Sequence, residues 1–255
     1  MTTDFLILIL VGALSGATSG YIGSFMVLKR MSLVGDALSH VALPGIAIAL
    51  TFGINPMIGA ILALFFAAFG IWYLEEHSEI YPDALVGVFF TASLALGLLI
   101  TPEVELLEAL FGNLDSIGRL DGIFTVIGAV AIFIVAFMVS KKLLLIIVSK
   151  DLAKSQNINV KKVDLIYLLL VSSVVALGVK FLGTLLTGAM VILPAVTAKN
   201  LAKDIKSFQI LSMILGIFST LTGIMIARNY NLASGPVIVL TAVVFFIVSY
   251  LFRKK

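Results

Sequence analysis

Long apolar runs with few or no charges constrain the fold of this chain more than any other feature. Many runs approach or exceed the roughly 20 residues that a helix needs to cross a bilayer, and segments 84–101 and 235–252 contain no charged residue at all. Barrel strands would instead alternate apolar and polar residues over about 10 positions, and that alternation is absent from the sequence. The sequence therefore predicts an all-α, polytopic transmembrane helical bundle.

Composition excludes the main soluble classes. Of the 255 residues, 61% are apolar and 12% are charged, whereas a soluble domain has about 25% charged residues. A soluble enzyme, a nucleic-acid-binding protein and a disordered scaffold are excluded, and we expect the lipid bilayer rather than nucleic acid around the chain. The absence of cysteine excludes disulfides and thiolate metal sites.

Nine spans are predicted, within a single transmembrane domain that covers residues 1–255. They are roughly residues 5–28, 33–53, 55–74, 84–101, 121–141, 163–180, 182–198, 208–227 and 235–252. With this assignment only Arg119, Lys180 and Arg228, of 17 basic residues, fall on one side of the membrane. Cytoplasmic loops carry the excess of Lys and Arg. We therefore expect a multi-pass protein of the plasma (cytoplasmic) membrane, with its amino terminus outside and its carboxyl terminus cytoplasmic.

Acidic residues gather between the fourth and fifth spans, in the predicted outer segment 102–120. They include Glu103 and Glu105, which are candidate residues of a pathway or gate. The segment is either a solvated acidic loop or a vestibule that attracts cations.

The longest predicted cytoplasmic segment, 142–162, contains a possible short helix. Ser149 or Asp151 can cap its start, and Asn157 can end it, since Asn tolerates the left-handed conformation. This helix is either a docking element for a soluble partner or an ordinary connection. The sequence contains no phosphate-binding loop of the G-x-x-x-x-G-K-[ST] type. A nucleotide that drives transport would therefore bind to another chain.

Asp36 and His40 are the clearest ionisable pair within a span. Their i, i+4 spacing places both side chains on one helical face, and a carboxylate and an imidazole there can both bind a divalent metal. Ionisable residues inside a membrane are costly and usually functional. The alternative is an intrahelical ion pair that only packs against a neighbouring span. His77, in a charged cytoplasmic turn, is expected to be solvated.

Ser39 and Pro44 are further candidates for the pathway or gate. Pro44 has no N–H for the carbonyl of His40, so that carbonyl is free, and we expect a kink or break near residues 44–45. In the seventh span, Gly183, Gly188 and Ala189 are expected to allow close helix approach.

Five segments together resemble the membrane permease of the manganese, zinc and iron ABC importers. They are VLKRMSLVGDALSHVALPG (27–45), DALVGVFFTASLALG (83–97), LAKSQNINV (152–160), GTLLTGAMVILPAVTAK (183–199) and SGPVIVL (234–240). The resemblance implies the fold of the type II ABC importer permeases. It also implies a second copy of this chain, ABC ATPase subunits on the cytoplasmic face and an extracellular metal-binding protein.

The same resemblance implies roles for individual residues. Asp36 and His40 match the Asp and His that line the metal pathway in the family. The segment 149–160 matches the coupling helix that docks on the ATPase, although Asn157 stands where the family usually has Gly. The residues expected to couple to the ATPase are Asp151, Leu152, Ala153, Lys154, Ser155, Gln156 and Asn157.

The predicted function is that of the permease subunit of an ATP-driven importer of divalent manganese, zinc or iron. The metal ion is the substrate, this chain binds no cofactor and performs no bond chemistry, and ATP binds to the partner subunit. One alternative within the same fold is the import of a metal chelate or a vitamin. Others are a secondary metal carrier that needs no ATPase, and a structural subunit without a pathway.

Overall fold

The structure, a computed structural model, describes residues 2–100, 109–110 and 119–252, and the described chain is almost entirely helical. The helices are α1 (Thr2–Leu28), α2 (Val34–Thr51), α3 (Pro56–His77), α4 (Pro82–Ile100), α6 (Arg119–Val148), α7 (Lys150–Ser155), α8 (Val160–Leu182), α9 (Thr184–Leu201), α10 (Ile205–Tyr230) and α11 (Ser234–Leu251).

The predicted number of spans is confirmed within the described residues. Every helix there except the short α7 is long and apolar enough to cross a membrane, which gives nine candidate spans. The predicted boundaries differ from the observed ones by a few residues. Glu103, Glu105 and most of segment 102–120 lie outside the described residues.

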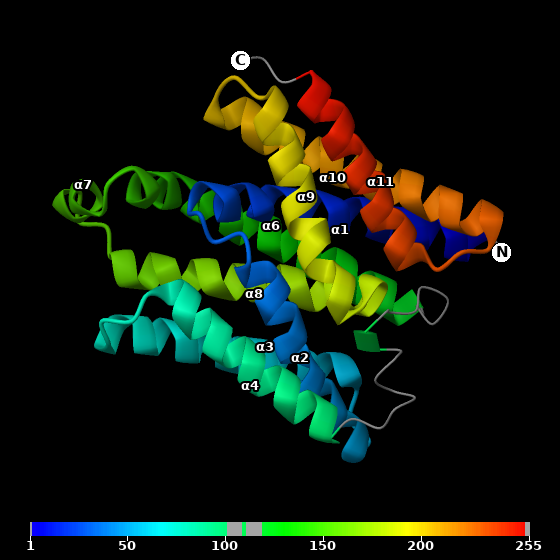
Figure 1. Cartoon of the computed structure of the whole chain (residues 1–255), viewed down its shortest axis with the longest axis horizontal. Coiled ribbons are helices and arrows are strands. Elements are labelled where there is room, and N and C mark those ends of the chain that lie inside the picture. Colours follow the sequence, from blue (N-terminus) through cyan, green and yellow to red (C-terminus); the bar gives the residue numbers. More distant parts are fainter. Residues whose placement is uncertain (1, 101–108, 111–118, 253–255) are drawn as a thin grey trace.

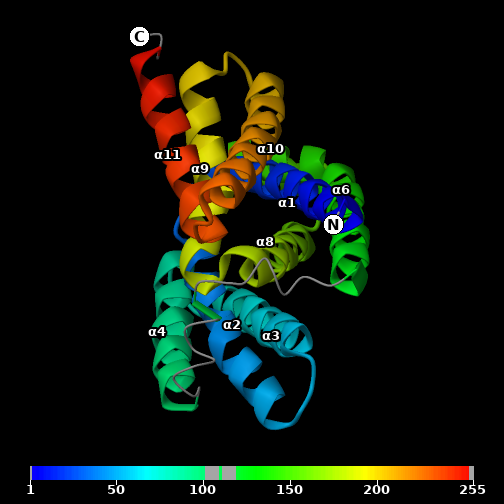
Figure 2. The same ribbon diagram turned by 90° about the vertical axis from the view of Figure 1, so that its right-hand side faces the viewer.

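Helix α2 lies between two groups of helices. It packs against α3 and α4 on one side and against α9 on the other, and α9 in turn packs against α10 and α11. The helices α1, α6 and α8 contact one another and join the two groups (Figures 1 and 2). The short α7 lies at one end of the molecule, and the amino terminus lies at the opposite end (Figure 1).

Polar residues at helix ends fix where several spans begin and stop. The Asn55 side chain accepts a hydrogen bond from Met57 N at 2.9 Å, and Pro56 follows as the first residue of α3. Proline is favoured there because its missing N–H would be unpaired anyway. Asn231 ends α10 with a φ of 51°, the left-handed conformation that Asn tolerates.

Small residues let the helices approach closely, as expected where lipid removes the hydrophobic drive for helix association. Gly16 of α1 packs directly on the backbone of Gly216 of α10, so that a Cβ on either would overlap the other's carbonyl group. α2 and α8 are the most buried spans, whereas α4 and α11 are the most exposed. The exposed apolar faces of α4 and α11 therefore need lipid or another chain to cover them.

Candidate functional site

Asp36 and His40 lie on the buried helix α2, as predicted. Asp36 stands in the first helical turn, where the helix dipole favours a negative charge. Asp36 is half-buried, and His40 is 8% exposed. The sequence thus brings a carboxylate and an imidazole to one face of a buried helix, one turn apart.

The His40 ring is held by an aromatic side chain rather than by a hydrogen bond. Phe90 of α4 meets it edge to face, with ring centroids 5.3 Å apart. Nδ1 of His40 is buried and has no hydrogen-bond partner within the part of the chain that the structure describes. Buried polar atoms are nearly always paired, so an unpaired imidazole nitrogen is consistent with a ring that binds something the single chain lacks.

Ser39 ties α2 to α9. Its side chain is fully buried, and its Oγ lies 2.6 Å from the Asp36 carbonyl oxygen and 2.5 Å from the Thr184 carbonyl oxygen. A hydroxyl has one proton to donate, so the two carbonyls share it. This geometry positions the start of α2 against α9, and it places Ser39 between two helices.

Gly188 makes the other close contact between α9 and α2. A Cβ built on Gly188 would lie 2.5 Å from Asp36 Cα and 2.7 Å from Asp36 Cβ. The backbone of α9 therefore packs directly against the residue proposed to bind metal. The prediction that Gly188 allows close helix approach is confirmed.

Pro44 lies inside α2, which continues through it from Val34 to Thr51 as one helix. Of the predicted kink or break near residues 44–45, the break is therefore absent. Pro44 still cannot donate to the carbonyl of His40. Gly97 of α4 packs beside Pro44. A Cβ built on Gly97 would lie 2.9 Å from Leu43 Cβ and 3.6 Å from Pro44 Cδ. Neighbouring helices therefore support α2 at the point where its backbone lacks one hydrogen bond.

Asp36 and His40 do not form a complete metal site by themselves. Among the described residues, no group of three or more His, Cys, Asp or Glu side chains is placed to hold a metal ion. His77, the second histidine, is exposed and stacks on Tyr73, with Nδ1 2.8 Å from the Tyr73 carbonyl oxygen. It is the last residue of α3, and its exposure agrees with the prediction of a solvated residue.

The predicted short helix is present as α7. Ser149 caps its start and accepts a hydrogen bond from Leu152 N at 3.2 Å. Asn157 follows the helix with a φ of 56°, and Ile158 N then donates to the Ala153 carbonyl oxygen at 3.1 Å. The prediction that Asn157 ends this helix in the left-handed conformation is confirmed.

One face of α7 is buried, and the rest is exposed. Ala153 is completely buried, which anchors α7 to the bundle. Leu152 is 46% exposed although it lies among polar residues. The other exposed residues of the predicted coupling set are Asp151, Lys154, Ser155, Gln156 and Asn157. An apolar side chain in this position is available to a protein partner.

The comparisons with known proteins agree with this architecture. The sequence pattern of the ABC 3 transport family matches residues 3–253. The chain belongs to the ABC 3 transport family. The predicted family is thus confirmed, and the family is one of transporters.

Curated relatives of this ABC 3 family chain extend over nearly its whole length. The manganese import system permease protein ScaB of Streptococcus parasanguinis is 35% identical over 244 residues, covering 94% of this chain and 87% of the relative. The high-affinity zinc uptake system membrane protein ZnuB of Haemophilus influenzae is 30% identical over 252 residues, 97% of both chains.

Solved structures confirm the fold of this family member. PsaBC from Streptococcus pneumoniae in complex with Fab matches with a TM-score of 0.85 and 32% identity, covering 97% of this chain and 91% of that chain. An inward-facing putative metal-chelate type ABC transporter matches with a TM-score of 0.77 over 97% of this chain and 85% of that chain. At 17% identity, this second match shows a shared fold only.

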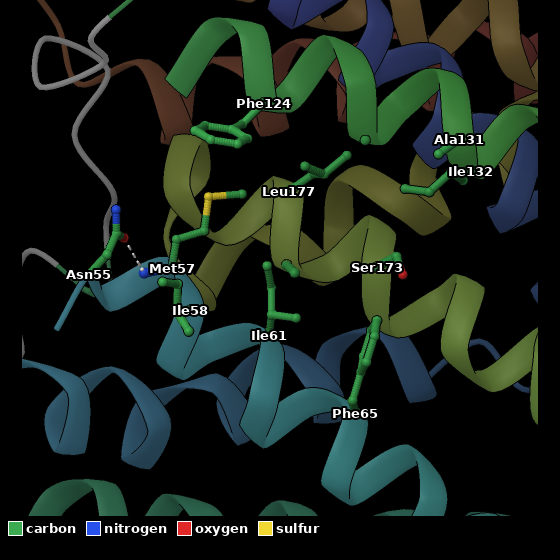
Figure 3. A pocket seen from close by; sticks show the side chains of 12 residues that line it. Asn55, Met57, Ile58, Ile61, Phe65, Phe124, Ala131, Ile132, Ser173 and Leu177 are labelled. Carbon is green, nitrogen blue, oxygen red and sulfur yellow. Dashed lines mark hydrogen bonds between the residues drawn. The ribbon is translucent and has the colours of Figure 1, made fainter. Parts of the chain in front are cut away.

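A large cavity in this ABC 3 permease fold lies away from the candidate site. It measures about 480 Å³ and lies between α3, α6 and α8 (Figure 3). Phe65, Phe124 and Leu177 line it, and Asn55 stands at one end. The Ser173 hydroxyl in its lining donates to the Leu169 carbonyl oxygen of its own helix. The described residues that line this cavity include no His, Cys, Asp or Glu.

Two features of the site escape prediction from the sequence. Phe90 is one of 18 phenylalanines, and nothing local marks it as the contact of His40. Thr184 accepts the Ser39 hydroxyl through its backbone, which leaves no side-chain signal. The glycine-rich start of the seventh span is the one local clue that α9 approaches another helix there.

Proposed function

We propose that this chain is the membrane-spanning permease of an ATP-driven importer of a divalent transition metal ion, manganese, zinc or iron. Two relatives named for manganese import and zinc uptake support this substrate class. The observation that carries the proposal is the Asp36 and His40 pair on buried α2, where Nδ1 of His40 has no hydrogen-bond partner among the described residues. These side chains provide one oxygen ligand and one nitrogen ligand, a set that suits these metals.

The remaining ligands come from outside the described part of one chain. In this proposal a second copy of the chain completes the pathway, and Asp36 and His40 of both copies contribute to it. An extracellular metal-binding protein delivers the ion, with the amino terminus of the permease outside and the carboxyl terminus in the cytoplasm. Glu103 and Glu105 attract the cation at the entrance, and Pro44 and Ser39 shape the α2 segment that the ion passes.

ATP hydrolysis belongs to separate ATPase subunits on the cytoplasmic side. In the proposal they bind α7 through Leu152 and its exposed polar neighbours. This permease then performs no bond chemistry, and its own task is to bind the ion, release it and close the pathway behind it.

Uptake of radiolabelled manganese, zinc and iron tests the proposal. Cells would express the chain with its ATPase and binding protein, as wild type, His40→Ala or His77→Ala, with membrane levels measured for each. The two variants form a matched pair, because the chain has two histidines and His77 is exposed. We expect uptake to fall to background in His40→Ala and to remain in His77→Ala.

Two results would contradict parts of this proposal. Full uptake by His40→Ala would remove His40 from the metal site. If the wild-type assembly imported none of manganese, zinc and iron, the proposed function itself would be wrong.

A further inference from the structure

The first turns of α8, directly after α7, are fastened to two other helices. Lys161 pairs with Glu76 near the end of α3, and Asp164 pairs with Lys29 just after α1. We call the four residues Lys29, Glu76, Lys161 and Asp164 the cytoplasmic clamp. Neither the metal site nor the predicted coupling set includes them.

The Lys29–Asp164 pair is the more buried half of the clamp. Lys29 Nζ lies 2.6 Å from Asp164 Oδ1, and the two side chains are 16% and 10% exposed. Lys29 Nζ also lies 4.4 Å from the centroid of the Tyr167 ring, close enough for a cation–π contact. The Lys29 ammonium group is held both by the Asp164 carboxylate and by the Tyr167 ring, so the ion pair has one defined geometry.

Lys161 adds a second attachment, from α8 to α3. Its ammonium group pairs with Glu76, and its backbone carbonyl accepts a hydrogen bond from Trp72 Nε1 at 2.9 Å. Trp72 is the only tryptophan of the chain. The start of α8 is therefore attached to the end of α1 and to α3, the helices before and after α2 in the sequence.

The connection from Lys29 to the metal-binding helix is short and hydrogen-bonded. Lys29 N donates to the Phe25 carbonyl oxygen at 2.8 Å, and Met31 N donates to the Met26 carbonyl oxygen at 2.9 Å. Val34, the first residue of α2, donates to the Met31 carbonyl oxygen at 3.2 Å. The first two bonds hold the turn to the end of α1, and the third joins it to the start of α2, where Asp36 lies.

The other end of the connection reaches α7. Five residues, 156–160, separate the end of α7 from Lys161. A cavity of about 350 Å³ is lined by Lys150, the first residue of α7, together with Lys29 and Asp164. The cavity leaves space beside the Lys29–Asp164 pair in which the first turn of α7 can shift.

We propose that the cytoplasmic clamp transmits movement of α7 to the metal-binding end of α2. Its members are positioning residues, since they act on Asp36 and His40 through the turn at residues 29–34 and do not touch the ion. The proposal rests on the proposed function, because it assigns the clamp the step between the ATPase and the metal site. Buried ion pairs add little to stability compared with apolar replacements, so a role in fixing one geometry accounts better for charges at this position.

The ratio of metal imported to ATP hydrolysed tests the clamp in reconstituted complexes of permease, ATPase and binding protein. We expect Lys29→Met and Asp164→Asn to assemble with the ATPase and to hydrolyse ATP. The ratio should fall at least about fivefold, the lower end of typical coupling between sites. The exchange variant Lys29→Asp with Asp164→Lys should recover part of it. Lys162→Met is the matched control, since Lys162 forms no ion pair in the described part of the chain, and it should keep the wild-type ratio.

The outcomes separate this inference from the proposed function. If wild-type complexes do not import metal, the proposed function fails. If they do, and both single variants keep the wild-type ratio, the clamp proposal is overturned. Should the buried variants fail to assemble, Lys161→Met and Trp72→Phe test the second attachment with milder changes. An unchanged ratio in both of these would then overturn the proposal.

Discussion

Gly188→Ala is the substitution that most directly tests how α9 positions Asp36. The new Cβ would lie 2.5 Å from Asp36 Cα, whereas an ordinary contact begins at 3.4 Å. The two helices must therefore separate by the difference, about 0.9 Å, because the obstructing atoms belong to the backbone and to Cβ and cannot rotate away. Overpacking of this kind typically costs about 1–3 kcal/mol.

The expected result is a strong loss of uptake together with a lower unfolding temperature in detergent. Separation of α9 from α2 also weakens the Ser39 contact, which is one helical turn away from Asp36. Radiolabelled manganese or zinc uptake, normalised to membrane level, measures the first effect. Thermal unfolding of the purified chain measures the second.

Gly128→Ala provides the matched control for this experiment. The three atoms nearest to its Cβ would all belong to the Leu177 side chain, at 3.3 Å and beyond. Leu177 also lines the 480 Å³ cavity, so it has space to move aside. Gly128→Ala should therefore keep uptake and stability close to wild type. If Gly188→Ala behaved like Gly128→Ala, the argument that close packing of α9 fixes Asp36 would be refuted.

Three further substitutions follow from the contacts of α2 and α7. Ser39→Ala should destabilise the chain by about 0.6 kcal/mol, the average for interhelical hydrogen bonds in membranes, whereas Ser173→Ala, which loses a bond within its own helix, should change the unfolding temperature less. Leu152→Asp should abolish co-purification with the ATPase, and Leu232→Asp, in the turn after α10, should not. Asn157→Gly should be tolerated. Asn157→Val should destabilise the left-handed turn after α7 by about 1–2 kcal/mol, and it should weaken co-purification with the ATPase.

Features that depend on local sequence were predicted well. Apolar length and charge distribution define the nine candidate spans among the described residues. The hydroxyl of Ser149 and the left-handed tolerance of Asn157 define α7. Each of these features depends on one continuous stretch of residues, so the local sequence is sufficient to predict it.

Features that depend on contacts between distant helices could not be predicted. Asp164 lies inside the predicted span 163–180, and only the fold shows that its partner is Lys29, 135 residues away. Of the kink or break expected near Pro44, the break is absent for a similar reason. Loss of one backbone bond favours a break in an isolated helix, but α3, α4 and α9 surround α2 and hold it together.

The two proposed metal ligands are held by different neighbours, and this has a consequence for transport. Asp36 is fixed by α9, through Gly188 and the shared Ser39 hydroxyl. His40 is held instead by Phe90 of α4, and α4 packs mainly on α2 and α3. A movement of α4 relative to α2 would therefore free the His40 ring while Asp36 remained in place against α9. A pathway built in this way can change its nitrogen ligand and its oxygen ligand at separate steps.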